Sequence, residues 1–334
     1  MTRRWTPLDT ARQDRSPYVD ALTAFIDAEH VRWGIPGHQG SPEAQSYLAE
    51  YVGEDVLRLD VQTMVQGIDL GPGNPFDESL ALAAEAWGAR RTWFLTNGSS
   101  QGNLVCGLAV AGLGGSLVAQ RSVHSSVVDA LAMSGLEATF VTPDIDSSLG
   151  ILHTLTPEAL EEALVATPDA TAAIVVTPSY FGACADVEAL VAVAHAHDVA
   201  LVVDEAWGAH LGFHPGLPTN AARLGADLVV SSMHKLGGSL GQTALIHLGH
   251  GPYADRLEPL VDRAMRSMRS MAGSRSQLNA MSVAFEDHGE IVPTRGVTRN
   301  NSPRSALAGC SSSNLASLAR SSAVRARFCA TTCQ

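Results

Sequence analysis

Residues 199–247 read VALVVDEAWGAHLGFHPGLPTNAARLGADLVVSSMHKLGGSLGQTALIH, and two apolar runs in this stretch each end in a group of polar side chains. The first run, 199–203, leads into Asp204, and the second, 227–231, leads into Ser232, His234 and Lys235. Short apolar runs with polar and glycine residues at their ends are typical of buried strands. Ligands of open α/β sheets bind at the carboxyl ends of strands, so these polar groups mark a candidate binding site.

Lys235 is the only lysine in a chain with 22 basic residues. A lysine amine whose pKa is lowered in a partly desolvated site can condense with an aldehyde, whereas an arginine guanidinium does not. A sole lysine placed after Ser-x-His at a strand end therefore points to pyridoxal phosphate (PLP), an aldehyde cofactor. The alternative is an ordinary surface lysine in a lysine-poor protein.

Asp204 strengthens the first interpretation, because it follows the apolar run one strand before Lys235. A carboxylate at that position can bind the pyridinium nitrogen of PLP and keep it protonated, which makes the ring an electron sink. The alternative role is a cap on the following helix, which is common for aspartate at a strand end.

Several motifs around these two residues carry a family resemblance. Asp-Glu-Ala-Trp-Gly-Ala-His-Leu at 204–211, then Phe-His, Leu-Pro, Gly-Ala-Asp and Ser-x-His-Lys, resemble the PLP-binding core of the ornithine/lysine/arginine decarboxylase family. The resemblance covers about residues 30–270. It implies a fold type I PLP enzyme that decarboxylates arginine, lysine or ornithine, and the sequence does not decide among the three substrates.

The resemblance also implies roles for individual side chains. Lys235 would hold the cofactor, Asp204 its ring nitrogen, and His124 and Ala206 would lie against the two faces of the ring. His234 would contact the phosphate or move a proton, and the phosphate itself would be held by Ser99, Ser100 and Ser232. The implied catalytic residues are Lys235, His124, Asp204 and His234. Without the resemblance, the Gly/Ser turn at 97–103 and His124 are also readable as helix-capping groups.

Strand and helix patterns alternate from about residue 92 to residue 231, which predicts an α/β fold with a mostly parallel, seven-stranded sheet flanked by helices. A further run at 243–247 follows too closely for a crossover helix, so we expect it to lie antiparallel to its neighbour. The seven predicted strands are 92–96, 116–119, 137–141, 172–177, 199–203, 227–231 and 243–247.

Composition narrows the function further. The net charge is −12, and residues 1–262 are strongly acidic, which disfavours nucleic-acid binding by this part of the chain. No apolar run is long enough to span a membrane, and no secretory signal is apparent, so we expect a cytoplasmic protein. Cys106 and Cys184 are predicted to be buried thiols. No histidine or cysteine spacing predicts a metal site.

The composition changes near residue 263. Residues 263–334 contain 10 arginines and 3 acids, with many serines and little apolar periodicity. We therefore predict an N-terminal helical segment and loop at 1–45, a PLP-binding large domain at 46–270, and a disordered Ser/Arg-rich tail at 271–334. A family-like C-terminal small domain is not recognisable, and a shifted reading frame is one hypothesis for the tail.

These patterns lead to three functional hypotheses. The first is a PLP-dependent basic amino acid decarboxylase, a homodimer or higher homo-oligomer, whose activity is weakened by the aberrant tail. The second keeps PLP but changes the reaction to that of an aminotransferase or aldolase, because one fold serves several reactions. The third is a truncated, non-catalytic product.

Overall fold

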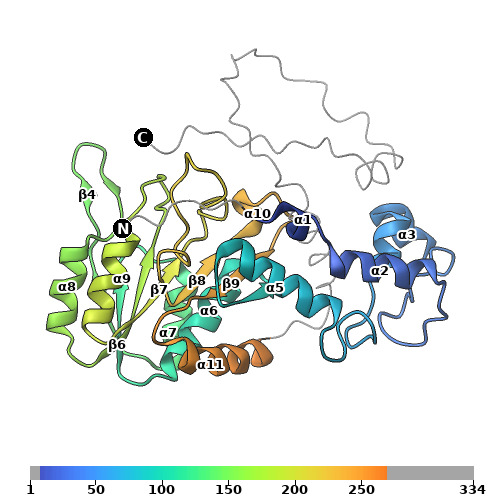
Figure 1. The fold of residues 1–334 in the computed structure, drawn as a ribbon, viewed down its shortest axis with the longest axis horizontal. Coiled ribbons are helices and arrows are strands. Elements are labelled where there is room, and N and C mark those ends of the chain that lie inside the picture. The colour runs from blue at the N-terminus through green and yellow to red at the C-terminus, as the bar shows by residue number, and fades with distance from the viewer. Residues whose placement is uncertain (1–7, 269–334) are drawn as a thin grey trace, which may run out of the picture.

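The computed structural model describes residues 8–268, which form a central sheet covered by helices on both faces (Figure 1). The main sheet has seven strands in the order β1-β9-β8-β7-β6-β2-β3. All seven predicted strands are present, with ends that differ from the prediction by at most two residues: β1 Arg91–Leu95, β2 Ser116–Gln120, β3 Ala138–Val141, β6 Ala170–Val176, β7 Ala200–Asp204, β8 Leu228–Ser231 and β9 Ala244–Leu248.

The sheet is mostly parallel, as predicted. Strands β3, β2, β6, β7 and β8 pair parallel to one another in that order, and β9 pairs antiparallel with both β8 and β1. The expected antiparallel strand after Lys235 is therefore confirmed. The α/β architecture with a mostly parallel, seven-stranded sheet predicted from the sequence is also confirmed.

Helices cover the two faces of the sheet because side chains along each strand alternate between the faces. Val202 packs in a cluster with helices α6, α7 and α11, whereas its neighbours Leu201 and Val203 pack with α8 and α9. The helices of the first face are α6 Gly98–Ala111, α7 Ser125–Ser134 and α11 Ala254–Ser267, and those of the second are α8 Pro157–Ala166 and α9 Val187–Ala196.

The N-terminal residues form a separate group of helices. Tyr18, Leu22 and Trp87 join them to the sheet through a third cluster that includes Phe94 and Leu245. In Figure 1 helices α2 and α3 lie at the end of the molecule away from α8 and α9. The helices are α1 Thr10–Gln13, α2 Pro17–Asp27, α3 Ser46–Val52, α4 Glu54–Leu59 and α5 Pro75–Trp87, and the remaining short elements are β4 Ile145–Asp146, β5 Ile151–Leu152 and α10 Met233–Leu236.

Local signals explain where two of the helices begin. Helix α5 begins at Pro75, because the Asn74 side chain accepts a hydrogen bond from the Asp77 N–H at 2.9 Å and Pro75 suits the first helical turn. Helix α6 begins at Gly98, within the predicted turn. The φ of Gly98 is +69°, a conformation that favours glycine and lets the chain enter the helix directly after β1.

The prediction for the two cysteines is half correct. Cys106 is fully buried in α6, and burial raises the pKa of its thiol. Cys184 is exposed, because it lies in the loop between β6 and α9 and not in a strand or helix.

The predicted tail at 271–334 lies outside the described residues, and the division at residues 45 and 270 remains a prediction. Within residues 8–268, the helices are too short or too polar to cross a membrane.

Candidate functional site

A pocket of about 380 Å³ lies at the carboxyl ends of the strands, where the sequence predicted a site. Its walls come from three connections: the β1–α6 junction, the segment after β2, and the segment from β8 to β9. Five predicted site residues meet there. The lining residues are Asn97, Gly98, Ser99, Ser100, His124, His234, Lys235 and Gln242.

Ser99 and Ser100 lie in the first turn of α6 and so at the positive end of a 14-residue helix. The first N–H groups of a helix have no partner within it, and together with two hydroxyls they form a donor set that suits a phosphate. The helix start is held close to the sheet. A Cβ at Gly102 would lie only 2.6 Å from Val230 Cγ1, so glycine is required for this approach.

Asp204, at the end of β7, is buried and held by two donors. Its Oδ2 accepts from Asn103 Nδ2 at 2.9 Å, and its Oδ1 accepts from the Ala206 N–H at 3.1 Å. Burial raises the pKa of Asp204, while these hydrogen bonds and the charge of Lys235 act in the opposite direction. A cation beside this buried carboxyl group would strongly favour its ionised form.

Lys235 lies in α10, directly after β8, and is half-buried. Burial lowers the pKa of its amine, and the Asp204 charge opposes that shift. The Nζ atom lies 4.4 Å from the centroid of the Trp207 ring. A lowered pKa increases the fraction of neutral amine, which is the nucleophilic form.

The two pocket histidines are each held through Nδ1. His124 Nδ1 lies 3.2 Å from the Ser126 N–H nitrogen and 2.8 Å from Ser126 Oγ. His234 Nδ1 lies 3.2 Å from both Ser232 Oγ and the Thr243 carbonyl oxygen. Ser232 is fully buried and does not line the pocket. Its hydroxyl contacts His234 instead.

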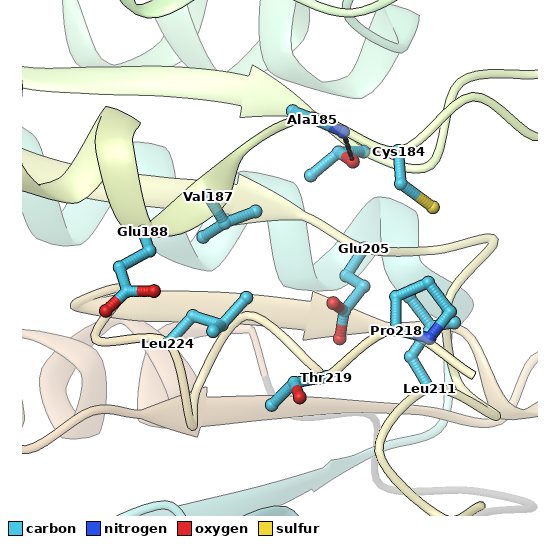
Figure 2. A pocket seen from close by; sticks show the side chains of 10 residues that line it. Cys184, Ala185, Val187, Glu188, Glu205, Leu211, Pro218, Thr219 and Leu224 are labelled. Atoms are coloured by element: carbon cyan, nitrogen blue, oxygen red, sulfur yellow. Dashed lines mark hydrogen bonds between the residues drawn. The ribbon is translucent and has the colours of Figure 1, made fainter. Parts of the chain in front are cut away.

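Ala206 and Glu205 complete the segment after β7. Ala206 is buried and fixes Asp204 through its N–H. Glu205 lies in a second pocket, between the β6–α9 loop and the 211–224 segment (Figure 2), where its Oε1 accepts from the Ala221 N–H at 2.8 Å. Burial raises the pKa of Glu205 well above its ordinary value. Glu205 therefore anchors the chain after β7 and is not a second carboxylate beside Lys235.

The donor set fits PLP. A phosphate suits the N-terminus of α6 with Ser99 and Ser100, an aldehyde suits the Lys235 amine, and a ring nitrogen cation suits the buried carboxyl of Asp204. All three groups lie at one edge of the sheet.

Sequence reasoning missed three residues at this site. Asn103 contacts Asp204 across 101 positions of sequence, and Ser126 links Asn103 to His124. Trp207 faces Lys235. Asn103 belongs to the serine- and glycine-rich segment 97–103 named above, but it lies in α6, and Ser126 lies in α7. Only their three-dimensional contacts identify the two as site residues.

Other titratable groups lie apart from the pocket. His195 Nε2 pairs with Asp227 at 2.9 Å, and His197 Nε2 pairs with Glu161 at 2.8 Å. Among residues 8–268, histidine, cysteine, aspartate and glutamate do not gather in groups of three that could hold a metal ion.

Comparisons with known proteins identify the family of the chain. Residues 16–286 match the family described as Orn/Lys/Arg decarboxylase, major domain. The arginine decarboxylase of Halalkalibacterium halodurans is 37% identical over 242 residues, which are 72% of this chain and 49% of that protein. The arginine decarboxylase of Bacillus subtilis is 36% identical over 251 residues, 75% of this chain and 51% of that protein.

A solved structure shows the same fold. Lysine decarboxylase A from Pseudomonas aeruginosa superposes with a TM-score of 0.72 at 23% identity, covering 84% of this chain and 41% of that one. The chain thus spans about half the length of the curated relatives it matches. The match at 16–286 begins before the predicted start of the resemblance and runs past Ser270. The chain belongs to the Orn/Lys/Arg decarboxylase family, through its major domain.

Proposed function

We propose that this protein uses PLP to decarboxylate a basic amino acid. The observation that carries the proposal is the position of Lys235: the sole lysine of the chain lines a pocket together with the N-terminus of a helix, close enough to the buried Asp204 for their charges to interact. This combination supplies an amine, a phosphate site and a carboxylate for one cofactor.

Each proposed contact uses a different part of the pocket. Ser99, Ser100 and the N–H groups of the first turn of α6 hold the phosphate, with Ser232 supporting His234 beside it. Lys235 supplies the amine for attachment of the aldehyde. Asp204 holds the ring nitrogen, and His124 and Ala206 lie against the ring.

When bound, PLP accepts the electron pair that remains as the α-carboxylate of the substrate leaves as CO₂. The chain contributes two effects to this reaction. The Asp204 carboxylate, kept in place by Asn103 and the Ala206 N–H, holds a proton on the ring nitrogen. Trp207 covers one side of the Lys235 amine and limits the access of water to it.

The substrate class follows from the family and the named relatives. Two relatives are named arginine decarboxylases, so arginine is the first substrate to test, with lysine and ornithine beside it. The partners we propose are this small amino acid and a second copy of the chain, and a cytoplasmic location remains a prediction. Nucleic acid and membrane are not among the proposed partners.

The test is the release of CO₂ from carboxyl-labelled arginine, lysine and ornithine by the full-length chain and by Lys235→Ala. We expect slow release that requires Lys235, because the composition after residue 270 departs from the rest of the chain. Formation of a keto acid without CO₂ would favour an aminotransferase. Labelled CO₂ released equally by wild type and Lys235→Ala would contradict the proposal.

A further inference from the structure

A chain of hydrogen bonds connects Asp204 to His124 through Asn103 and Ser126. Asn103 Nδ2 lies 2.9 Å from Asp204 Oδ2 and 3.0 Å from Ser126 Oγ, and Ser126 Oγ lies 2.8 Å from His124 Nδ1. We propose that Asn103 and Ser126 are positioning residues that hold neutral His124 with its proton on Nε2, so that His124 is a hydrogen-bond donor in the pocket. The inference deepens the proposed function, on which it rests for the role of the pocket.

The backbone of Ser126 determines the hydrogen-bonding role of the His124 Nδ1 atom. The backbone N–H of Ser126 points at this atom at 3.2 Å, and an N–H can only donate. His124 Nδ1 must therefore accept. In a neutral imidazole one nitrogen accepts and the other carries the proton, so the proton lies on Nε2.

The side-chain hydrogen bonds between Asp204 and His124 also have defined directions. Asn103 Nδ2 carries two hydrogens and donates one to the buried Asp204 carboxylate and one to Ser126 Oγ. Ser126 Oγ accepts from Asn103, and because His124 Nδ1 accepts, the hydroxyl donates its own hydrogen to that atom. The hydrogen bonds thus run in one direction, from Asn103 outward to Asp204 and to His124.

His234 provides a contrast within the same pocket. Its Nδ1 lies 3.2 Å from the carbonyl oxygen of Thr243, and a carbonyl can only accept. Neutral His234 therefore carries its proton on Nδ1 and presents the lone pair of Nε2. The two pocket histidines therefore have opposite tautomers: at Nε2, His124 is a hydrogen-bond donor and His234 a hydrogen-bond acceptor.

The experiment is ¹⁵N NMR of histidine-labelled full-length protein at mildly alkaline pH, as purified and with added PLP. Protonated and unprotonated ring nitrogens have well separated ¹⁵N shifts, and His124→Gln and His234→Gln assign the two signals. We expect unprotonated Nδ1 in His124 and unprotonated Nε2 in His234. The variants are Ser126→Ala and Asn103→Leu, with Ser125→Ala, an exposed serine of the same helix, as the matched control.

In Ser126→Ala and Asn103→Leu the backbone N–H of residue 126 still favours an accepting Nδ1. The loss of the side-chain hydrogen bond should nevertheless raise the minor His124 tautomer by about fivefold, because one hydrogen bond contributes about 1 kcal/mol. Ser125→Ala should match wild type. A wild-type His124 with its proton on Nδ1 would overturn the inference even if a variant failed to fold. A Ser126→Ala spectrum identical to that of Ser125→Ala would overturn the positioning role. Neither result depends on Lys235 binding PLP, so a failure of this inference can be distinguished from a failure of the proposed function.

Discussion

Acidification should destabilise the fold through His247, a fully buried histidine of β9. Its Nδ1 lies 2.8 Å from Thr92 Oγ1, its ring stacks on Trp87 at 5.0 Å, and its Nε2 has no hydrogen-bond partner among the described residues. Burial lowers the pKa of His247 from 6.5 to about 3. The folded state thus keeps this histidine neutral where the unfolded state takes up a proton.

The sign and size of the effect follow from this difference. Above the unfolded pKa of 6.5 His247 is neutral in both the folded and the unfolded state, so its titration does not change the free energy of unfolding there. As the pH falls from 6.5 toward 3, each unit removes about 1.4 kcal/mol from the free energy of unfolding. Between pH 8 and pH 5 the loss is about 2 kcal/mol, a large part of the 5–15 kcal/mol that is typical of domains.

The assay is urea denaturation of wild type, His247→Phe and His250→Phe at a series of pH values. Phenylalanine can keep the stacking on Trp87 but cannot titrate, so the difference between wild type and His247→Phe isolates this residue from the buried carboxyls. His250 is exposed and serves as the control. Wild type and His250→Phe should lose about 2 kcal/mol relative to His247→Phe between pH 8 and pH 5. Parallel curves for all three proteins would refute the reasoning.

Three further predictions concern the site and the tail. Asp204→Asn should still attach PLP to Lys235 but lose decarboxylation by about a hundredfold to a thousandfold, because an amide no longer stabilises the ring proton; wild-type turnover would mean that Asp204 only shapes the turn after β7. Gly102→Ala should lower the free energy of unfolding by about 1–3 kcal/mol, because its Cβ would overlap Val230, whereas Ser125→Ala should change it by less than about 0.5 kcal/mol in the same urea titration. Reading the coding DNA beyond the codon for Ser270 should reveal an open frame with helix and strand periodicity, and stop codons in both other frames would count against a shifted frame.

The strands were the most predictable part of the fold. A strand that is buried on both faces of a sheet appears in the sequence as a short, mostly apolar run, as at 199–203 and 227–231. The polar residues at its end mark where the strand stops, so its position can be predicted from the local sequence. Helix starts were less predictable. Gly98 begins α6 with a positive φ, and its N–H donates to the carbonyl oxygen of Gln242, a tertiary contact that helix propensity does not contain.

The site residues also differ in how far the sequence could predict them. Lys235 and Asp204 stand out by their chemistry and by their places at strand ends, whereas His124, Ser99 and Ser100 needed the family resemblance. Asn103 could not be identified, because its partner Asp204 lies 101 positions away and asparagine in a helix is usually unremarkable. The roles proposed for these site residues remain predictions.

The central claim is tested most directly by borohydride reduction of the purified full-length protein incubated with PLP, followed by peptide mapping. The account predicts a yellow protein that is bleached on reduction and carries one pyridoxyl group on Lys235, since the sole lysine leaves only the N-terminal amine to compete. A reduced protein with no pyridoxyl group on Lys235 would contradict it.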